Sequence, residues 1–151
     1  MDFPSRKPVE TSLPDLISKS LNIQPKITLK ARDYVLVYET EEDIIKVKID
    51  RQTFDLVNLS PGGVVVTARG NNCDFVSRFF TPNTSILEDP VTGSSHCSLI
   101  PYWSEILNKK EMIARQLSQR QGILYCEDKD DRVLISGTAK TYLMGSIWID
   151  L

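Results

Sequence analysis

Hydrophobic positions along this 151-residue chain follow helical spacing in some segments and alternate strictly in others. After Ser12 and Pro14, four apolar residues fall on one helical stripe, and this spacing predicts a first helix. These residues are Leu13, Leu16, Ile17 and Leu21. Farther along, residues 53–60 indicate a short helical turn that ends at the Pro-Gly-Gly sequence of residues 61–63.

Four further segments have the composition or alternation of β-strands. Residues 33–40 are rich in β-branched and aromatic side chains, and residues 43–50 alternate after a short acidic turn, which predicts an antiparallel pair. Residues 64–68 are too apolar for a half-exposed strand, so we expect both of their faces to be covered. Residues 74–82 predict another strand, which a proline closes.

The second half of the chain predicts two helices followed by three strands. Residues 95–107 are so apolar that a helix formed by them must be buried. Residues 109–120 fit a second, amphipathic helix. Strands are then predicted at three alternating segments, with a hairpin turn at residues 128–131. The strands are residues 122–127, 132–139 and 141–150. The pattern as a whole predicts an α+β domain, rich in antiparallel strands, with one buried helix in its middle.

Composition narrows the choice of function classes. Hydrophobic residues make up 41% of the chain, which suits one domain with a real core. The 18 basic and 20 acidic residues are well mixed, so no basic field is available to hold a nucleic-acid backbone. No apolar run approaches the length of a membrane span, and the start has no signal peptide. We therefore expect a cytoplasmic protein without a nucleic-acid or membrane partner.

The three cysteines are odd in number, far apart and without a CxxC pair. They are Cys73, Cys97 and Cys126. Such cysteines are typical of buried thiols in a reducing compartment. Cys97 is a candidate nucleophile only if a base lies beside it, and an inert buried thiol is the simpler interpretation.

The motif EDPVTGSSH, residues 88–96, is the strongest chemical signal in the sequence. Pro90 biases Asp89 toward an extended backbone, so this acid stays outside the helix that follows. Thr92, Ser94 or Ser95 can cap that helix, and Gly93 allows the chain to turn into it. Because the first backbone N–H groups of a helix are unpaired and carry partial positive charge, Gly93, Ser94 and Ser95 form a candidate anion site. Asp89 would then act as a general acid or base on the bound molecule.

The same motif also has a purely structural interpretation. A sequence of the type Asp-Pro-x-x-Gly-Ser most often forms a turn followed by a capped helix. His96, the single histidine, would more often be packed and hydrogen-bonded than catalytic, since a helix N-terminus disfavours its protonated form. No second histidine, cysteine or aspartate lies at metal-ligand spacing, so no metal is expected.

Residues 78–103, RFFTPNTSILEDPVTGSSHCSLIPYW, closely resemble the signature of the phenazine-biosynthesis-like (PhzF-like) isomerase family. The blocks GVVVTARG, DFVSRFF, ARQLSQRQG and VLISGTAK resemble the flanking blocks of the family, in the same order. The resemblance implies a diaminopimelate epimerase fold, with two similar lobes, each a β-barrel-like sheet around a central helix. It also implies an acid/base isomerase that needs no cofactor, with its active site in the cleft between the lobes.

In that resemblance the whole chain, residues 1–151, corresponds to the C-terminal lobe alone, without the N-terminal lobe and its catalytic glutamate. Asp89 matches the substrate-binding aspartate, Ser94 the polar residue at the start of the helix, and Gly93 the glycine that helps to hold the substrate carboxylate. Ser85 and Gln121 depart from the family pattern at loop positions where glycine is usual.

Two functions follow from this resemblance. In the first, the chain contributes the carboxylate-binding half of a site for proton-shift isomerisation of a small carboxylate-bearing substrate. In the second, it is a non-catalytic binding or assembly module, either a split-gene subunit or a degenerate remnant. Either way we expect a homodimer, or a complex with a separately encoded N-terminal lobe, formed through an apolar surface to which Phe79 or Phe80 contributes.

Overall fold

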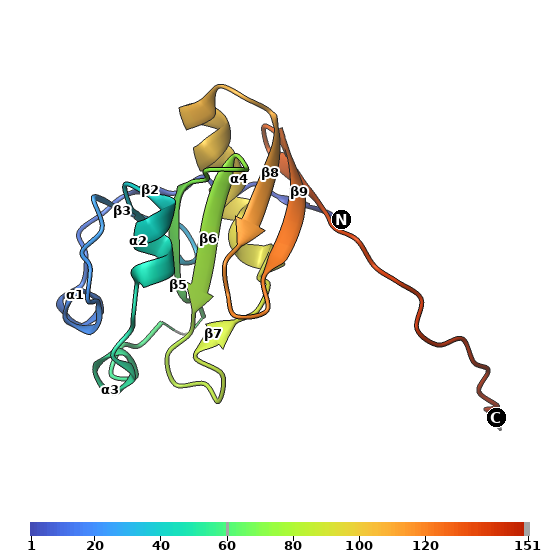
Figure 1. The fold of residues 1–151 in the computed structure, drawn as a ribbon, viewed down its shortest axis with the longest axis horizontal. Helices are drawn as coiled ribbons and strands as arrows, with labels where there is room; N and C mark the ends of the chain where they lie inside the picture. The colour runs from blue at the N-terminus through green and yellow to red at the C-terminus, as the bar shows by residue number, and fades with distance from the viewer. Residues whose placement is uncertain (60, 150–151) are drawn as a thin grey trace.

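The computed structural model describes residues 1–59 and 61–149, which form a mixed sheet with helices on both of its faces (Figure 1). The strands are β1 (Asp2–Pro4), β2 (Val9–Glu10), β3 (Ile27–Lys30), β4 (Tyr34–Val37), β5 (Val64–Arg69), β6 (Phe75–Phe80), β7 (Glu88–Asp89), β8 (Glu111–Gln116), β9 (Gly122–Lys129) and β10 (Arg132–Ser136). The helices are α1 (Asp15–Ser20), α2 (Glu41–Lys46), α3 (Arg51–Phe54) and α4 (Gly93–Leu107). The expected α+β class is confirmed.

The ten-stranded sheet has the order β1-β10-β9-β8-β6-β5-β4-β3-β2, and β7 pairs with β6 beside this path. Two neighbouring pairs are parallel, namely β4 with β5 and β6 with β8. Parallel neighbours need a long crossover, and here α2 and α3 form the first crossover and α4 the second. The sheet is rich in antiparallel pairs, as the sequence predicted, but it is mixed, because helices connect two pairs of strands that lie side by side.

Both faces of the central strands are covered, so the core has two parts. Alternate residues of β5 and β6 point to opposite faces: Val65 and Phe75 pack on the side of α4, whereas Val66 and Val76 pack on the side of α1–α3. This double coverage explains why residues 64–68 show no polar alternation, as the sequence predicted.

Helix α4 is the buried helix that the sequence predicted over residues 95–107. It packs against β8, β9 and β10, and nine of its residues from Ser95 to Ser104 are buried. The hydrogen-bonded path of the sheet runs from β1 to β2, and these two strands do not pair with each other in the described part of the chain. The barrel-like form of the sheet therefore stays a prediction.

Residues 43–50, predicted to be a strand, instead contribute to helix α2, and that prediction is wrong. Thr40 and Asp43 form a capping box, in which each side chain accepts a hydrogen bond from the other residue's backbone N–H. Acidic residues in the first turn add to this start signal, because they complement the positive end of the helix. This local signal overrides the β-branched composition of the segment.

Residues 109–120, predicted to be an amphipathic helix, contain strand β8, so this prediction is also wrong. Met112, Ala114 and Gln116 are buried, and the residues between them are exposed or half-buried, which is the period of a strand. The segment becomes a strand because it pairs with β9 on one side and β6 on the other. Such tertiary pairing overrides local helix propensity.

Smaller differences affect the remaining elements. The first helix begins at Asp15 rather than at Ser12, with Pro14 as its N-cap residue. Helix α3 is the short turn predicted over residues 53–60, shifted toward the N-terminus; residue 60 lies outside the described residues.

The strand predicted over residues 141–150 does not form in the described residues of that segment, 141–149, and residue 150 lies outside the description. Residues 137–149 extend away from the sheet without regular structure (Figure 1). Within the described residues, no helix is long and apolar enough to cross a membrane.

Candidate functional site

The two adjacent acids of strand β7 have different surroundings. Glu88 forms a two-pronged ion pair with Arg78, in which Nε and Nη2 of the guanidinium lie 2.7 Å and 2.9 Å from the two carboxylate oxygens. Arg78 Nη1 also donates to the carbonyls of Ile44 and Val47 at the end of α2. Glu88 therefore fixes β7 to the rest of the fold, and Asp89 is the acid left for chemistry.

Asp89 is joined to the start of α4 by a small closed network. Thr92 Oγ1 donates to Asp89 Oδ2 at 2.6 Å. The side chain of Gln116, which is fully buried, donates from Nε2 to the Asp89 carbonyl at 2.7 Å and accepts at Oε1 from Thr92 N at 2.7 Å. Because one partner can only accept and the other can only donate, the orientation of the Gln116 amide is fixed. The network holds Asp89 beside the first turn of α4.

The first turn of α4 has no side-chain cap at its N-cap residue. Thr92 is the N-cap residue, but its side chain makes no capping hydrogen bond. A Cβ added to Gly93 would meet nothing within 4 Å, so open space lies in front of this residue. Ser94 is exposed, whereas Ser95 is buried and its hydroxyl donates to the Thr92 carbonyl at 3.0 Å. Of the two serines, only Ser94 can offer its hydroxyl to a bound molecule.

His96 is a packed core residue, as its structural interpretation predicted. It is fully buried, its ring lies against Phe75, and Nδ1 is 2.8 Å from the carbonyl oxygen of Thr92. Since a carbonyl can only accept, Nδ1 bears the proton of the neutral ring. Burial lowers the pKa of His96 to about 4, so the imidazole is neutral at pH 7.

The cysteines are not arranged as nucleophiles. Burial raises the pKa of the Cys97 thiol, and it raises the pKa of Cys126 to about 12, so both stay protonated at neutral pH. Cys73 is half-buried. In the part of the chain that the structure describes, no group of three or more His, Cys, Asp or Glu side chains could hold a metal ion.

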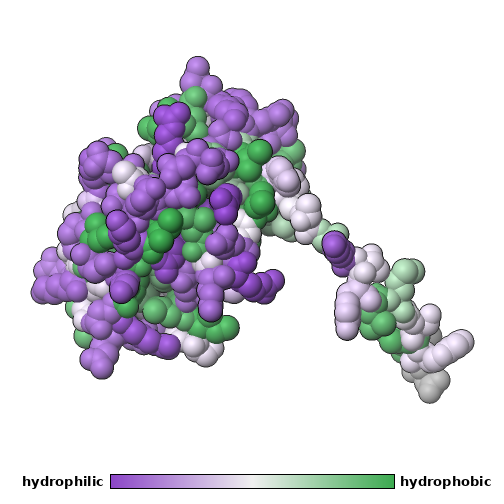
Figure 2. All heavy atoms as spheres, viewed as in Figure 1, coloured by the Kyte–Doolittle hydropathy of each residue, from purple (hydrophilic) through white to green (hydrophobic). Residues whose placement is uncertain are grey.

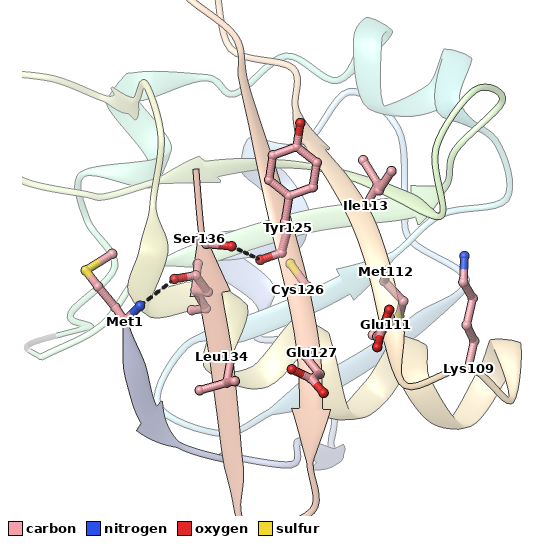
Figure 3. A pocket seen from close by; sticks show the side chains of 11 residues that line it. Met1, Lys109, Glu111, Met112, Ile113, Tyr125, Cys126, Glu127, Leu134 and Ser136 are labelled. Carbon is pink, nitrogen blue, oxygen red and sulfur yellow. Dashed lines mark hydrogen bonds between the residues drawn. The ribbon is translucent and has the colours of Figure 1, made fainter. Parts of the chain in front are cut away.

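One concave region lies at the start of α4, and another lies on the sheet away from it. The first, of about 500 Å³, is bordered by Val91 and Gly93 and reaches across to Ile123 on β9. The second, of about 600 Å³, lies on the outer face of β8–β10, where Ile113 and Tyr125 stand opposite each other (Figure 3). Only the first borders the helix start, so we place the candidate site there.

The sequence predicts a site at Asp89 and the helix start, but it does not predict Gln116 or the hydrogen bond from Thr92 to Asp89. The sequence pattern places Gln116 in an amphipathic helix, on whose polar face it would be solvated. A buried strand position for residue 116 would have been the signal, because a buried amide needs partners. The structure also corrects the expected apolar surface: Phe79 and Phe80 are only 8% and 2% exposed, so neither contributes to it.

Comparisons with known proteins show the family to which the chain is similar. A family model described as phenazine biosynthesis-like protein matches residues 4–145. An uncharacterized isomerase of Pseudomonas aeruginosa is 42% identical over 147 residues, and one of Halalkalibacterium halodurans is 38% identical over 152 residues. A crystal structure of a phenazine biosynthesis PhzC/PhzF protein from Clostridium difficile matches with a TM-score of 0.86 at 43% identity. The resemblance inferred from residues 78–103 is confirmed.

These matches cover nearly all of this chain but only part of each relative. The two isomerases match 97% of this chain and 56% of their own length, and the crystal structure matches 99% of this chain and 57% of its own. The chain thus spans about half the length of the curated relatives it matches.

Proposed function

Since this chain belongs to the family of phenazine biosynthesis-like proteins, we propose that it forms the carboxylate-binding half of an isomerase site. The observation behind this proposal is that Asp89 and the open first turn of α4 are held together through Thr92. The substrate is a small molecule with a carboxylate. Its reaction is a proton shift: one C–H bond breaks, a base takes the proton, and a proton returns at another carbon.

The helix start supplies the binding part of this function. Backbone N–H groups of Gly93, Ser94 and Ser95 have no acceptor within the helix, and they attract a carboxylate together with the positive end of the helix dipole. The Ser94 hydroxyl adds a donor at the same place. A carboxylate anchored there brings the adjacent carbon within reach of Asp89.

Asp89 supplies one of the two proton-transferring groups that a proton shift between carbons uses. A positioned acid or base contributes roughly 10²–10⁴-fold, and we propose a second group that works across the substrate from Asp89. The described residues around Asp89 offer no second candidate, because Glu88 is paired with Arg78 and His96 is buried and neutral. We assign the second group to a segment outside these 151 residues, in the same polypeptide or another.

A second function is favoured by exposed apolar side chains. Ile113, Ile123 and Tyr125 on the outer face of β8 and β9 are 45%, 55% and 46% exposed. Beyond β10, Tyr142 and Trp148 are almost fully exposed, and Figure 2 shows apolar side chains along this extended segment. Such surface suits an assembly module that packs on a second copy or on a separately encoded lobe.

Anion binding tests the first function. Titration of the ¹⁵N-labelled protein with acetate should shift the amide signals of Gly93, Ser94 and Ser95 in a saturable way. Asp89→Asn should preserve this binding or strengthen it, because a like charge is removed. Asp131→Asn, at an exposed acid in the β9–β10 turn, is the matched control and should change nothing. Absence of shifts in the unsubstituted protein, or their loss in Asp89→Asn, would refute the proposed site.

Proton exchange separates the two functions. The 151-residue protein alone should not catalyse exchange of C–H protons with D₂O in a panel of small carboxylic acids, because the second group is missing. Exchange should appear when the unmatched part of the Pseudomonas aeruginosa relative is added, and Asp89→Asn should abolish it. Robust exchange by the 151-residue protein alone would contradict a half-site. A complex that forms without any exchange would favour the assembly module.

A further inference from the structure

Gln116 is the buried link between strand β8 and the start of α4. Its side chain is 0% exposed, and it bridges the carbonyl of Asp89 and the backbone N–H of Thr92, each at 2.7 Å. Nε2 also lies 3.3 Å from Thr92 Oγ1, to which it donates. The Gln116 amide thus orients the backbone just before Pro90 and just after Val91. It also orients the hydroxyl of Thr92.

The hydroxyl of Thr92 is in an unusual state for a helix N-cap. Threonine at this position ordinarily accepts a hydrogen bond from the second or third N–H of the helix. Here Thr92 Oγ1 instead donates a hydrogen bond to Asp89 Oδ2 at 2.6 Å and accepts one from Gln116 Nε2, and it makes no capping hydrogen bond. The capping acceptor is therefore present in the sequence but is held away from the helix.

We propose that Gln116 is a positioning residue. It holds the Thr92 hydroxyl in its hydrogen bond to Asp89, and it thereby keeps the first turn of α4 uncapped and available to the substrate carboxylate. This inference rests on the proposed function for its purpose, but the arrangement can be tested without any ligand. Without Gln116, Thr92 Oγ1 can rotate and accept from the backbone N–H of Ser95, the third residue of the helix. The protein would gain a helix cap and lose an open anion site.

Hydrogen exchange of the Ser95 amide measures this directly. In Gln116→Met, which has similar length and no polar atoms, exchange of this amide should slow by roughly fivefold, as a cap of ordinary strength would cause. Sulfate, used as the probe anion, should bind roughly fivefold more weakly, because one of its donors is occupied. In Gln116→Asn, which is one methylene shorter, both effects should be smaller but have the same sign.

Two valine substitutions are the matched controls. Thr92→Val removes the hydroxyl but keeps the bond from Thr92 N to Gln116, so Ser95 exchange should stay as in the unsubstituted protein. In Gln116→Met combined with Thr92→Val, the slowing should disappear. Thr67→Val removes the acceptor of the Trp103 indole N–H, 2.9 Å away under the same helix, and so destabilises the core without touching the helix start. It should not slow Ser95 exchange.

Each outcome decides the inference. Faster Ser95 exchange in Thr92→Val would show that the hydroxyl already caps the helix, which overturns the proposal. Unchanged exchange in the Gln116 variants, or equal slowing in Thr67→Val, would reduce Gln116 to an ordinary core residue. If Gln116→Met does not fold, Gln116→Asn and Thr92→Val still decide. Sulfate that fails to bind the unsubstituted protein counts against the proposed function alone, because the exchange experiment involves no ligand.

Discussion

At the scale of single residues, burial and hydrogen bonding decide which polar groups remain available for chemistry. Glu88 and Asp89 are neighbouring carboxylates, yet Arg78 forms an ion pair only with Glu88. Ser94 and Ser95 are likewise neighbours, and only Ser94 is exposed. These differences arise because successive residues of a strand or a helix point in different directions.

His96 gives a pH-dependent prediction at this scale. Its folded pKa of about 4 lies below the usual value of 6.5, so the unfolded chain binds more protons between these two values. Stability should therefore fall as the pH is lowered from about 6.5 to 4, with a slope approaching 1.4 kcal/mol per pH unit from this residue. Urea unfolding at several pH values measures the slope, and His96→Asn, which can still donate to Thr92, should flatten it. An imidazole that titrates near pH 6.5 by NMR would disprove the buried, neutral state.

At the scale of elements, α4 shows that a hydrophobic pattern predicts a buried helix but not the burial of each of its residues. Leu99 and Trp103 are buried, as the sequence predicted, but Ile106 is 58% exposed, so its predicted burial is wrong. The helix buries most of its length and emerges from the sheet in its last turn (Figure 1). The apolar pattern established the helix, but not the point at which it leaves the core.

Trp103 and Ile106 provide a matched pair of substitutions on this helix. Trp103→Ala should destabilise the protein by roughly 3–5 kcal/mol, because it leaves a cavity beside Phe75 and removes the indole N–H that donates to the Thr67 hydroxyl. Ile106→Ala should cost less than about 1 kcal/mol, since little of that side chain is removed from water. Chemical denaturation measures both. Similar losses for the two variants would mean that the packing of α4 differs from the one described.

At the scale of the whole molecule, the described residues have an exposed apolar surface in two parts. This surface comprises Ile113, Ile123 and Tyr125 on the outer face of β8 and β9, together with the extended segment after β10. It lies elsewhere than the sequence suggested, because Phe79 and Phe80 are in the core. Exposed apolar patches often mark interaction sites, and we propose that this surface is one.

We expect the 151-residue protein to associate through this surface, with roughly 1,200–2,000 Å² buried in a two-fold dimer. Sedimentation at tens of micromolar should show a dimer, and Tyr125→Ser combined with Ile113→Ser should shift it toward monomer. Ile45→Ser is the control, because Ile45 is 60% exposed on α2, which packs against β5 and β6. A clean monomer that binds no hydrophobic dye would contradict the prediction.

The sequence by itself determined the strongest local features: the fully covered strand at residues 64–68, the strand over residues 74–82, the apolar helix over residues 95–107, and the Asp89–Ser94 motif at its start. Each has a signal within a few residues, either a run of apolar side chains or a proline and a glycine at fixed places. The family followed from the same stretch.

Only the tertiary structure decided the rest. Residues 111–116 became a strand because β6 and β9 pair with them, and pairing partners far away in the sequence leave no local trace. The same pairing buried Gln116 and brought its amide to Asp89 and Thr92, 27 and 24 positions away along the chain. Local pattern therefore fixed which residues begin the site, whereas long-range hydrogen bonding fixed how they are held. The physical reason is that an amide is forced to find partners only once the fold removes it from water.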